Sequence, residues 1–231
     1  MSSRTTEQFD AGNGVPVSFS FSGPDDASDR RAVLVFGHGA GANMDHANMV
    51  ALSDAFSDAG VVVLRFNFPF MEQGRRRVDS KPVSIATIAA ASKLARLRYP
   101  RLPLLLGGHS FGGRMASHAF LEADLGDVTA LVFGSFPLHP AGKPSTDRAA
   151  HLADIERPML FLSGTRDALA TGELLAGVVD ELGERAHLHR LDTADHGYKV
   201  LKRSRQSEQS VFEEMGEALA AFLDEVTTGK P

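Results

Sequence analysis

The segment GGHSFGG, residues 107–113, places a single serine between two glycine pairs at the end of an apolar run. Glycine loses more backbone freedom on folding than any other residue, so this arrangement carries a cost that something must offset. Residues 108–112 match G-x-S-x-G, the pattern of a strained strand-to-helix turn that exposes a serine hydroxyl. The sequence therefore predicts that Ser110 is a nucleophile. In the alternative interpretation the glycines form a turn and nothing more.

A serine hydroxyl is a weak nucleophile unless a base takes its proton, and the base needs an acid to orient it. In sites built on such a turn, the residues follow along the chain in the order serine, acid, histidine. Eight of the nine histidines are excluded as the base by their position in the chain. Each of these eight precedes Ser110, precedes the candidate acid, or falls within a predicted helix or strand. His196, in TADHGYK, follows the last predicted strand beside a glycine that lets the loop turn. We expect His196 to be the base.

The acid has one leading candidate and two rivals. Asp167 follows the buried run LFLSG and falls in the loop at its carboxyl end. Asp195 adjoins His196, and neighbouring side chains rarely form the required hydrogen bond, so we expect a solvated loop charge there. Asp192 can instead cap the end of a strand. The sequence therefore favours Asp167 as the acid that orients His196.

A tetrahedral intermediate also needs hydrogen-bond donors for its oxyanion. One donor is expected to be the backbone N–H of Phe111, directly after the nucleophile, and the other an N–H in the loop after the first parallel strand. That loop reads FGHGAGANMD, and its HGAG portion points to the N–H of Ala40. Both donors are backbone groups, so substitution of either side chain is expected to reveal little.

Short apolar runs, separated by segments of helical periodicity, must position these residues. Near-continuous apolar runs are typical of parallel strands that are covered on both faces. We expect such strands at 32–37, 61–67, 102–108, 128–134 and 157–164, a more edge-like strand at 186–192, and an N-terminal antiparallel strand at 15–21. Helices are expected at 44–59, 83–98, 112–123, 171–182 and 207–227, with the basic segment 199–206 as the solvated start of the last one.

Alternation of strand and helix predicts an α/β fold, a mostly parallel doubly wound sheet with helices on both faces. No repeat or linker divides the 231 residues, so we expect one domain over 1–231, without a large cap. Two longer irregular segments, 69–82 and 136–153, are expected to frame the ligand crevice at the carboxyl ends of the strands.

Composition limits the environment and the partners. The net charge of −5 argues against nucleic acid or an anionic membrane as a partner. The absence of cysteine removes disulfides, thiolate metal sites and a cysteine nucleophile, and it suits a reducing compartment. The start, MSSRTTEQFDAGNG, lacks the apolar core of a secretory signal, and no apolar stretch approaches the roughly 18 residues of a membrane span. We expect a cytoplasmic protein.

With these residues placed, the chain resembles the α/β-hydrolases, in particular the small dienelactone-hydrolase-like branch. The resemblance covers about Val33 to Lys199 and is carried by GHGAGANMD, RFNFPFMEQGRRRVDSKP, GTRD and DHGYK. It implies a catalytic triad of Ser110, Asp167 and His196. The nucleophile of dienelactone hydrolases proper is cysteine, whereas this chain has serine, so simple small-molecule esters become the expected substrates.

Three further patterns allow other interpretations. Residues 37–42 also fit the looser dinucleotide fingerprint, but the next strand ends in LRFN without the expected acid, so we predict no cofactor. His187-x-His189 lacks a third ligand, so we predict no metal site. A hydrolase-like scaffold that binds a protein partner stays as the second functional hypothesis, although no motif indicates such a partner.

The run GRRRVD, residues 74–79, concentrates three arginines in a loop expected near the site. Arginine forks suit carboxylate and phosphate groups, so Arg75 and Arg76 are candidates for contact with an anionic substrate. In the structural alternative, which we favour, these arginines are solvated or pair with Glu72 and Asp79 to hold the loop.

Overall fold

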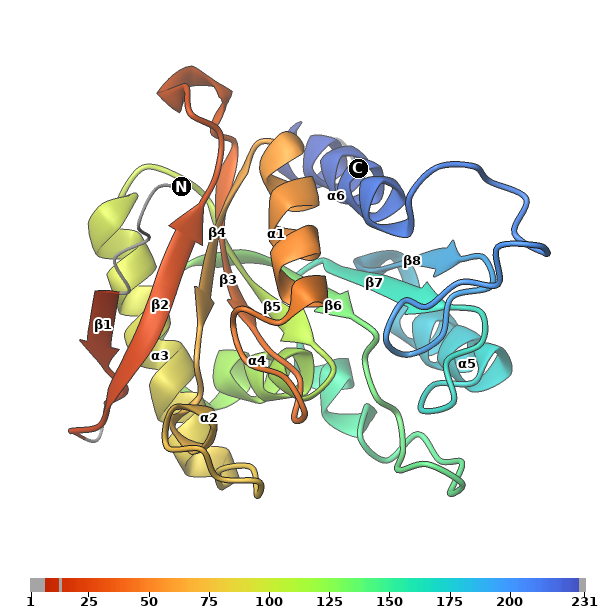
Figure 1. Ribbon diagram of the computed structural model, residues 1–231, viewed down its shortest axis with the longest axis horizontal. Helices are drawn as coiled ribbons and strands as arrows, with labels where there is room; N and C mark the ends of the chain where they lie inside the picture. Colours follow the sequence, from red (N-terminus) through yellow and green to blue (C-terminus); the bar gives the residue numbers. More distant parts are fainter. Residues whose placement is uncertain (1–6, 13, 229–231) are drawn as a thin grey trace.

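An eight-stranded sheet with the order β1-β2-β4-β3-β5-β6-β7-β8 forms the centre of the computed structural model, which describes residues 7–12 and 14–228 (Figure 1). Strands β3 to β8 are parallel, and β1 and β2 are antiparallel to their neighbours. The strands are β1 Glu7–Asp10, β2 Pro16–Ser22, β3 Ala32–Gly37, β4 Val61–Phe66, β5 Leu104–His109, β6 Val128–Gly134, β7 Met159–Gly164 and β8 Ala186–Leu191. The predicted fold class is confirmed.

Helices cover both faces of this sheet, as its apolar strands require. The helices are α1 Ala47–Asp58, α2 Pro69–Glu72, α3 Lys81–Arg98, α4 Phe111–Glu122, α5 Gly172–Leu182 and α6 Val211–Thr228. Alternate side chains of β3 point to opposite faces of the sheet. Leu34 packs in the core under α1 and α6, and Val35 packs in the core under α3 and α4. Helix α5 covers the second face over β6 and β7. Figure 1 shows α1 and α6 side by side.

Strand β1 was missing from the sequence-based prediction. Its sequence, EQFD, has one apolar residue, and so it lacks the alternation that marks a half-buried strand. Phe9 provides that one inward contact, with its ring centroid 5.8 Å from Phe19 and 6.2 Å from Phe66. Pairing with β2, rather than its own apolar pattern, makes this segment a strand. Residues 1–6, which include part of the segment examined for a signal, lie outside the described residues.

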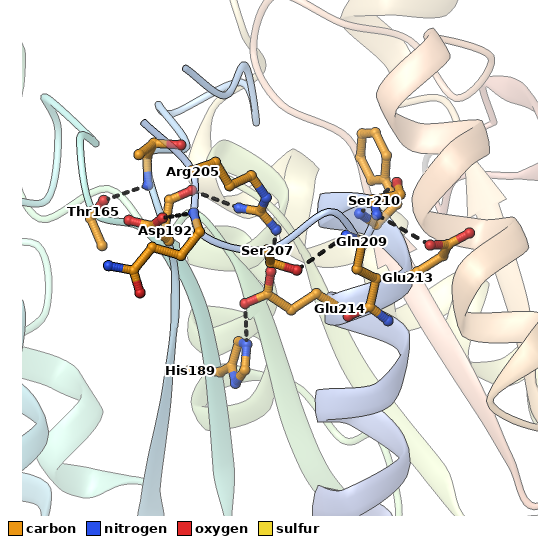
Figure 2. A network of polar contacts seen from close by, with 12 residues as sticks. Thr165, His189, Asp192, Arg205, Ser207, Gln209, Ser210, Glu213 and Glu214 are labelled. Carbon is orange, nitrogen blue, oxygen red and sulfur yellow. Dashed lines mark hydrogen bonds and ion pairs between the residues drawn. The ribbon is translucent and has the colours of Figure 1, made fainter. Parts of the chain in front are cut away.

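The prediction that residues 199–206 begin the last helix is wrong, because α6 begins at Val211. The segment runs instead as an irregular connection, and the side chain of Arg205 is only 4% exposed. Its guanidinium pairs with Glu214 of α6 and donates to the carbonyl of Asp192 at 2.6 Å (Figure 2). The Asp192 carboxylate accepts the N–H of Gln206 at 3.2 Å. These contacts tie the connection to the end of β8.

Backbone atoms of β3, β5 and α4 approach closely at three glycines. A methyl group at Gly112 would overlap the carbonyl oxygen of Gly37, and one at Gly108 would lie 2.5 Å from the same oxygen. Only residues without a side chain allow α4 to begin this close to the sheet. The glycines of the G-x-S-x-G segment are therefore required by the packing of the helix against two strands.

We expect Gly112→Ala to lower the free energy of unfolding by more than about 2 kcal/mol, because rigid backbone atoms must move to admit the methyl group. Gly177→Ala is the matched control: Gly177 lies inside α5, and nothing lies within 4 Å of the added carbon. This control should gain about 0.5–1 kcal/mol, as expected for alanine over glycine in a helix. Urea unfolding curves of both variants measure the two effects. Equal stability of Gly112→Ala and wild type would contradict the packing argument.

Candidate active site

Ser110 occupies a strained turn between β5 and α4. Its φ of 51° lies in the left-handed region, where residues other than glycine are uncommon. The turn is held because the N–H of Ser110 donates to the carbonyl of Gly134 at 2.8 Å. Helix α4 begins at the next residue, Phe111, so Ser110 stands at the positive end of a helix. Backbone strain of this kind costs about 1–3 kcal/mol and is concentrated at functional sites.

The structure brings together the three side chains that the sequence predicted as nucleophile, base and acid. His196 Nδ1 donates to the carboxylate of Asp167, at 2.8 and 2.9 Å from its two oxygens. His196 Nε2 lies 2.8 Å from Ser110 Oγ. Since the carboxylate accepts the proton on Nδ1, Nε2 is left to accept the hydroxyl proton of Ser110. Asp167 is fully buried and His196 is 25% exposed, so the acid is shielded while the base reaches the surface.

Asp167 is positioned by the turn that follows β7. Its backbone N–H donates to the carbonyl of Gly164 at 3.1 Å, and its Oδ1 accepts the N–H of Leu169 at 2.8 Å. The carboxylate therefore has a fixed orientation before it meets His196. At the same turn, the hydroxyl of Thr165 accepts the N–H of Thr193 at 2.9 Å (Figure 2). This hydrogen bond joins the Asp167 loop to the beginning of the loop that carries His196.

The His196 loop adds two details to the prediction. Asp195 is partly exposed, and its Oδ1 accepts the N–H groups of Gly197 and Lys199, each at 2.9 Å, and so shapes the turn. The left-handed residues after β8 are Thr193 and Tyr198, with φ of 57° and 65°, rather than Gly197. The buried ring of Tyr198 packs in the core under α6, which explains how the loop maintains that conformation.

The loop after β3 lies against the serine turn. A side chain at Gly39 would come within 2.8 Å of His109 Nδ1 and 3.7 Å of Ser110 Cβ, so glycine permits the close approach. Ala40 follows in a turn closed by the N–H of Ala42, which donates to the carbonyl of Gly39 at 3.2 Å. Among the described residues, the N–H groups of Ala40 and Phe111 have no hydrogen-bond partner. Their role as oxyanion donors stays a prediction.

His38 is a positioning residue that the sequence reasoning missed. The N–H of Phe68 donates to its Nε2 at 3.1 Å, and its Nδ1 donates to the carbonyl of Gly39 at 2.8 Å. Burial lowers the pKa of His38 to about 4, so the ring is neutral and can both donate and accept. His38 thus links the expected oxyanion loop to the end of β4. Its place in the HGAG portion was the signal that could have identified it.

His109, the residue before Ser110, contacts the loop that carries His196. Its Nε2 donates to the carbonyl of His196 at 3.1 Å. Its ring centroid lies 5.4 Å from that of His196 and 5.3 Å from that of Tyr198. Burial lowers the pKa of His109 to about 4, so this ring too is neutral near pH 7. His109 therefore connects the serine turn to the His196 loop.

The arginine loop is held partly by its own residues. Arg75 pairs with Asp79 at 2.5 Å, and Asp79 also accepts the N–H of Phe70 at 2.8 Å. The expected pairing with Glu72 is wrong, because that carboxylate instead accepts hydrogen bonds from side chains of three other residues, Gln8, Ser18 and Asn67. Arg76 is exposed and forms no ion pair with a described residue. Contact of Arg75 or Arg76 with a substrate stays a prediction.

Comparison with known proteins places the chain in context. Residues 30–224 match the family described as an alpha/beta hydrolase domain. An α/β serine hydrolase without a lid from Xanthomonas campestris has a TM-score of 0.72 at 17% identity, covering 100% of this chain and 99% of its own. A dienelactone hydrolase from Anabaena variabilis has a TM-score of 0.72 at 14% identity, and the match covers 96% of this chain and 97% of that chain. An esterase domain from Rhodothermus marinus has a TM-score of 0.69 at 18% identity, and the match covers 94% of this chain and 96% of that chain. At these identities the likeness concerns the fold.

Curated relatives from Pseudomonas aeruginosa match part of the chain. They are named as a component of an ion-translocating oxidoreductase complex and are 33% identical over 138 residues, which is 59% of this chain. The match covers 38% of their own length. In the part of the chain that the structure describes, no helix combines the length and apolar character needed to cross a membrane.

We expect acidification to destabilise the fold before most carboxylates titrate. The unfolded chain protonates His38 and His109 near pH 6.5, whereas the folded chain resists protonation down to about pH 4. The unfolded state therefore binds more protons between these values, and the free energy of unfolding falls as the pH falls through this window. Each histidine should contribute a loss of about 2 kcal/mol between pH 7 and pH 5.

Urea unfolding at pH 7, 6 and 5 measures this dependence. The double variant His38→Gln/His109→Gln should be less stable than wild type at pH 7 but should lose less stability on acidification. His46→Gln, a change at an exposed histidine whose charge is the smallest of the causes that shift the pKa of His109, should keep most of the wild-type pH dependence. If wild type is equally stable at pH 7 and pH 5, the two rings are not held neutral by the fold.

Proposed function

The chain belongs to the α/β-hydrolase family, and on that premise we propose that it is a serine hydrolase that cleaves small carboxylic esters through an acyl-enzyme intermediate. Family and fold support hydrolase activity in general. The proposal is carried by one observation: an unbroken hydrogen-bonded chain from Asp167 through His196 to Ser110, on a left-handed turn at a helix N-terminus. This order of acid, base and nucleophile is the arrangement that acyl transfer requires.

In the acylation step, Ser110 Oγ attacks the ester carbonyl while His196 Nε2 takes the hydroxyl proton. The resulting imidazolium is stabilised by Asp167, which stays ionised. Collapse of the tetrahedral intermediate breaks the bond to the alcohol oxygen, and His196 gives its proton to the departing alcohol. The acyl group is then bound to Ser110.

Deacylation repeats these roles with water as the nucleophile. His196 takes a proton from the water molecule, the hydroxide oxygen attacks the acyl carbonyl, and the returning proton releases Ser110. The carboxylic acid is the second product. In both steps the negative charge that develops on the carbonyl oxygen would be met by the N–H groups of Phe111 and Ala40.

Two considerations support a small ester as the substrate. The structural neighbours include proteins named as an esterase domain and a dienelactone hydrolase, both of which share this fold. The described residues form no separate cap domain over the serine turn, which suits compact acyl groups that need no enclosing lid.

A fluorophosphonate probe should form one covalent adduct at Ser110, detected by intact mass and peptide mapping. Ser110→Ala should abolish the adduct and Ser57→Ala, a change on α1, should leave it intact. The probe tests nucleophilicity without requiring the natural substrate. A folded wild-type chain that never reacts would overturn the proposal and favour the hypothesis of a scaffold for a protein partner.

Substitution of the two aspartates separates the acid from its rival. Asp167→Asn should retain the fold yet lose a factor on the order of 10⁴ in kcat for a p-nitrophenyl ester, because the histidine is left in the wrong tautomer. Asp195→Asn should lose far less, since an amide oxygen can still accept the N–H groups of Gly197 and Lys199. The reverse ranking would place the acid on the His196 loop.

A further inference from the structure

Tyr198 lies two residues after His196, in a short turn that backbone hydrogen bonds close. The N–H of Tyr198 donates to the carbonyl of Asp195 at 3.0 Å, and the N–H of Asp195 donates to the carbonyl of Lys199 at 3.1 Å. Tyr198 is 4% exposed, and its φ of 65° is costly for a residue with a side chain. Burial of the ring must offset this cost, so the position of the ring and the position of the His196 loop are linked.

The hydroxyl of Tyr198 lies against Gly134, the last residue of β6. A carbon added at Gly134 would overlap Tyr198 Oη, whereas it would lie 3.7 Å from Cζ of the same ring, an ordinary van der Waals distance. Gly134 does not have a positive φ, so glycine is required here by the space that the hydroxyl occupies. The carbonyl of Gly134 also accepts the N–H of Ser110 at 2.8 Å. One residue of β6 therefore contacts the Tyr198 side chain and holds the serine turn.

The ring of Tyr198 also packs between elements through two aromatic neighbours. His109, which directly precedes Ser110, has its ring centroid 5.3 Å from that of Tyr198, and its Nε2 donates to the carbonyl of His196 at 3.1 Å. Phe212 of α6 packs against Tyr198 with the ring centroids 5.8 Å apart. Helix α6 bears none of the three side chains of the candidate triad, so the contact with Phe212 supports the ring without reaching the reacting groups.

The two loops joined in this way come from strands that are not neighbours. Ser110 follows β5 and His196 follows β8, and strands β6 and β7 lie between them in the sheet. His196 Nε2 and Ser110 Oγ must nevertheless stay at their separation of 2.8 Å for proton transfer. A displacement of about 1 Å between reacting groups lowers a rate by about 10²-fold. A side chain that reaches from the His196 loop back to the end of β6 is therefore placed where it controls that separation.

We propose that Tyr198 is a positioning residue: its ring, packed against Gly134 and His109, holds His196 Nε2 at proton-transfer distance from Ser110 Oγ. The inference rests on the proposed function, because it assigns how the base and the nucleophile of that site are kept in register. Tyr198 acts through these neighbours and takes no part in the proton transfer itself. The aromatic ring carries this role, and the hydroxyl sets how closely the ring approaches β6.

Replacement of the ring tests the proposal. Tyr198→Leu should lower kcat for a p-nitrophenyl ester about 10- to 100-fold while KM changes by less than about threefold. The rate at which a fluorophosphonate labels Ser110 should fall by a similar factor. Tyr198→Phe keeps the ring and should stay within about threefold of wild type in kcat. Burial raises the pKa of Tyr198, so its hydroxyl is protonated and the phenylalanine variant removes no charge.

Phe212→Leu is the matched control, because it removes a ring that packs against Tyr198 in the same hydrophobic core. Both leucine variants should have a lower melting temperature than wild type, and their kinetics are compared at a temperature where both are folded. Phe212→Leu should keep kcat within about threefold of wild type. Equal losses of kcat in the two variants would mean that Tyr198 only stabilises the core, and would overturn the proposal.

Gly134 allows a test by compensation. Gly134→Ala adds a methyl group that overlaps the Tyr198 hydroxyl, so it should displace the ring with the His196 loop and lower kcat about 10- to 100-fold. Gly134→Ala/Tyr198→Phe removes the oxygen that the methyl group meets. Because the remaining ring atom Cζ lies 3.7 Å away, kcat of the double variant should recover to within about fivefold of wild type. A double variant as slow as Gly134→Ala would show that the methyl group acts through the backbone of the serine turn, and coupling through Tyr198 would be wrong.

A measurement without turnover separates this proposal from the proposed function. The proton that His196 Nδ1 donates to Asp167 should give a far-downfield ¹H NMR resonance in wild type and Tyr198→Phe, and this resonance should be lost in Tyr198→Leu. If this pattern is found but Ser110 never reacts with a fluorophosphonate, the positioning role stands and the hydrolase function fails. If Ser110 reacts as fast in Tyr198→Leu as in wild type, the hydrolase stands and the positioning role fails. Should Tyr198→Leu not fold, Gly134→Ala and its double variant provide the same comparison.

Discussion

The close approach of helix α4 to strands β3 and β5 is the steric constraint on which the candidate site depends. The carbonyl oxygen of Gly37 occupies the space that side chains at Gly108 and Gly112 would need. Helix α4 begins directly against the two strands, so the chain turns sharply at Ser110 and adopts a left-handed conformation there. That turn directs the hydroxyl toward His196 and leaves the N–H of Phe111 at the helix end. A chain unable to make this approach would retain the sheet but not the geometry of the site.

Neutral histidines connect the loops that surround this turn. His38 joins the loop after β3 to the end of β4, and His109 joins the serine turn to the His196 loop. In each case the ring donates a proton to a backbone carbonyl, and in His38 the second nitrogen also accepts one. Burial keeps these rings uncharged, and the backbone carbonyls that accept from Nδ1 of His38 and from Nε2 of His109 set their tautomers. His196 differs because it is partly exposed and is oriented by a buried carboxylate.

The arginines of the chain show how the same residue type serves different purposes. Arg75 and Arg205 each have an acidic partner and stabilise irregular segments on either side of the sheet's carboxyl edge. Arg114 and Arg148 lack such partners, although Arg114 is half-buried and lies one turn from Ser110. Arg75 and Arg205 therefore differ from Arg114 and Arg148 in having an acidic partner among the described residues.

The sequence by itself determined the order of parallel strands and helices along the chain. Each near-continuous apolar run and each apolar pattern of helical periodicity is formed by residues that are close in the sequence. It also singled out Ser110, Asp167 and His196, since chain order and loop position narrow those choices before any contact is known. Tertiary structure decided what depends on residues distant in the chain. Strand β1 exists through its pairing with β2, and residues 199–206 stay out of the last helix where Arg205 binds Asp192 and Glu214. The partners of His38, His109 and Arg205 were undetermined for the same reason: periodicity reports which face of an element is buried, whereas hydrogen bonds and ion pairs depend on which elements meet.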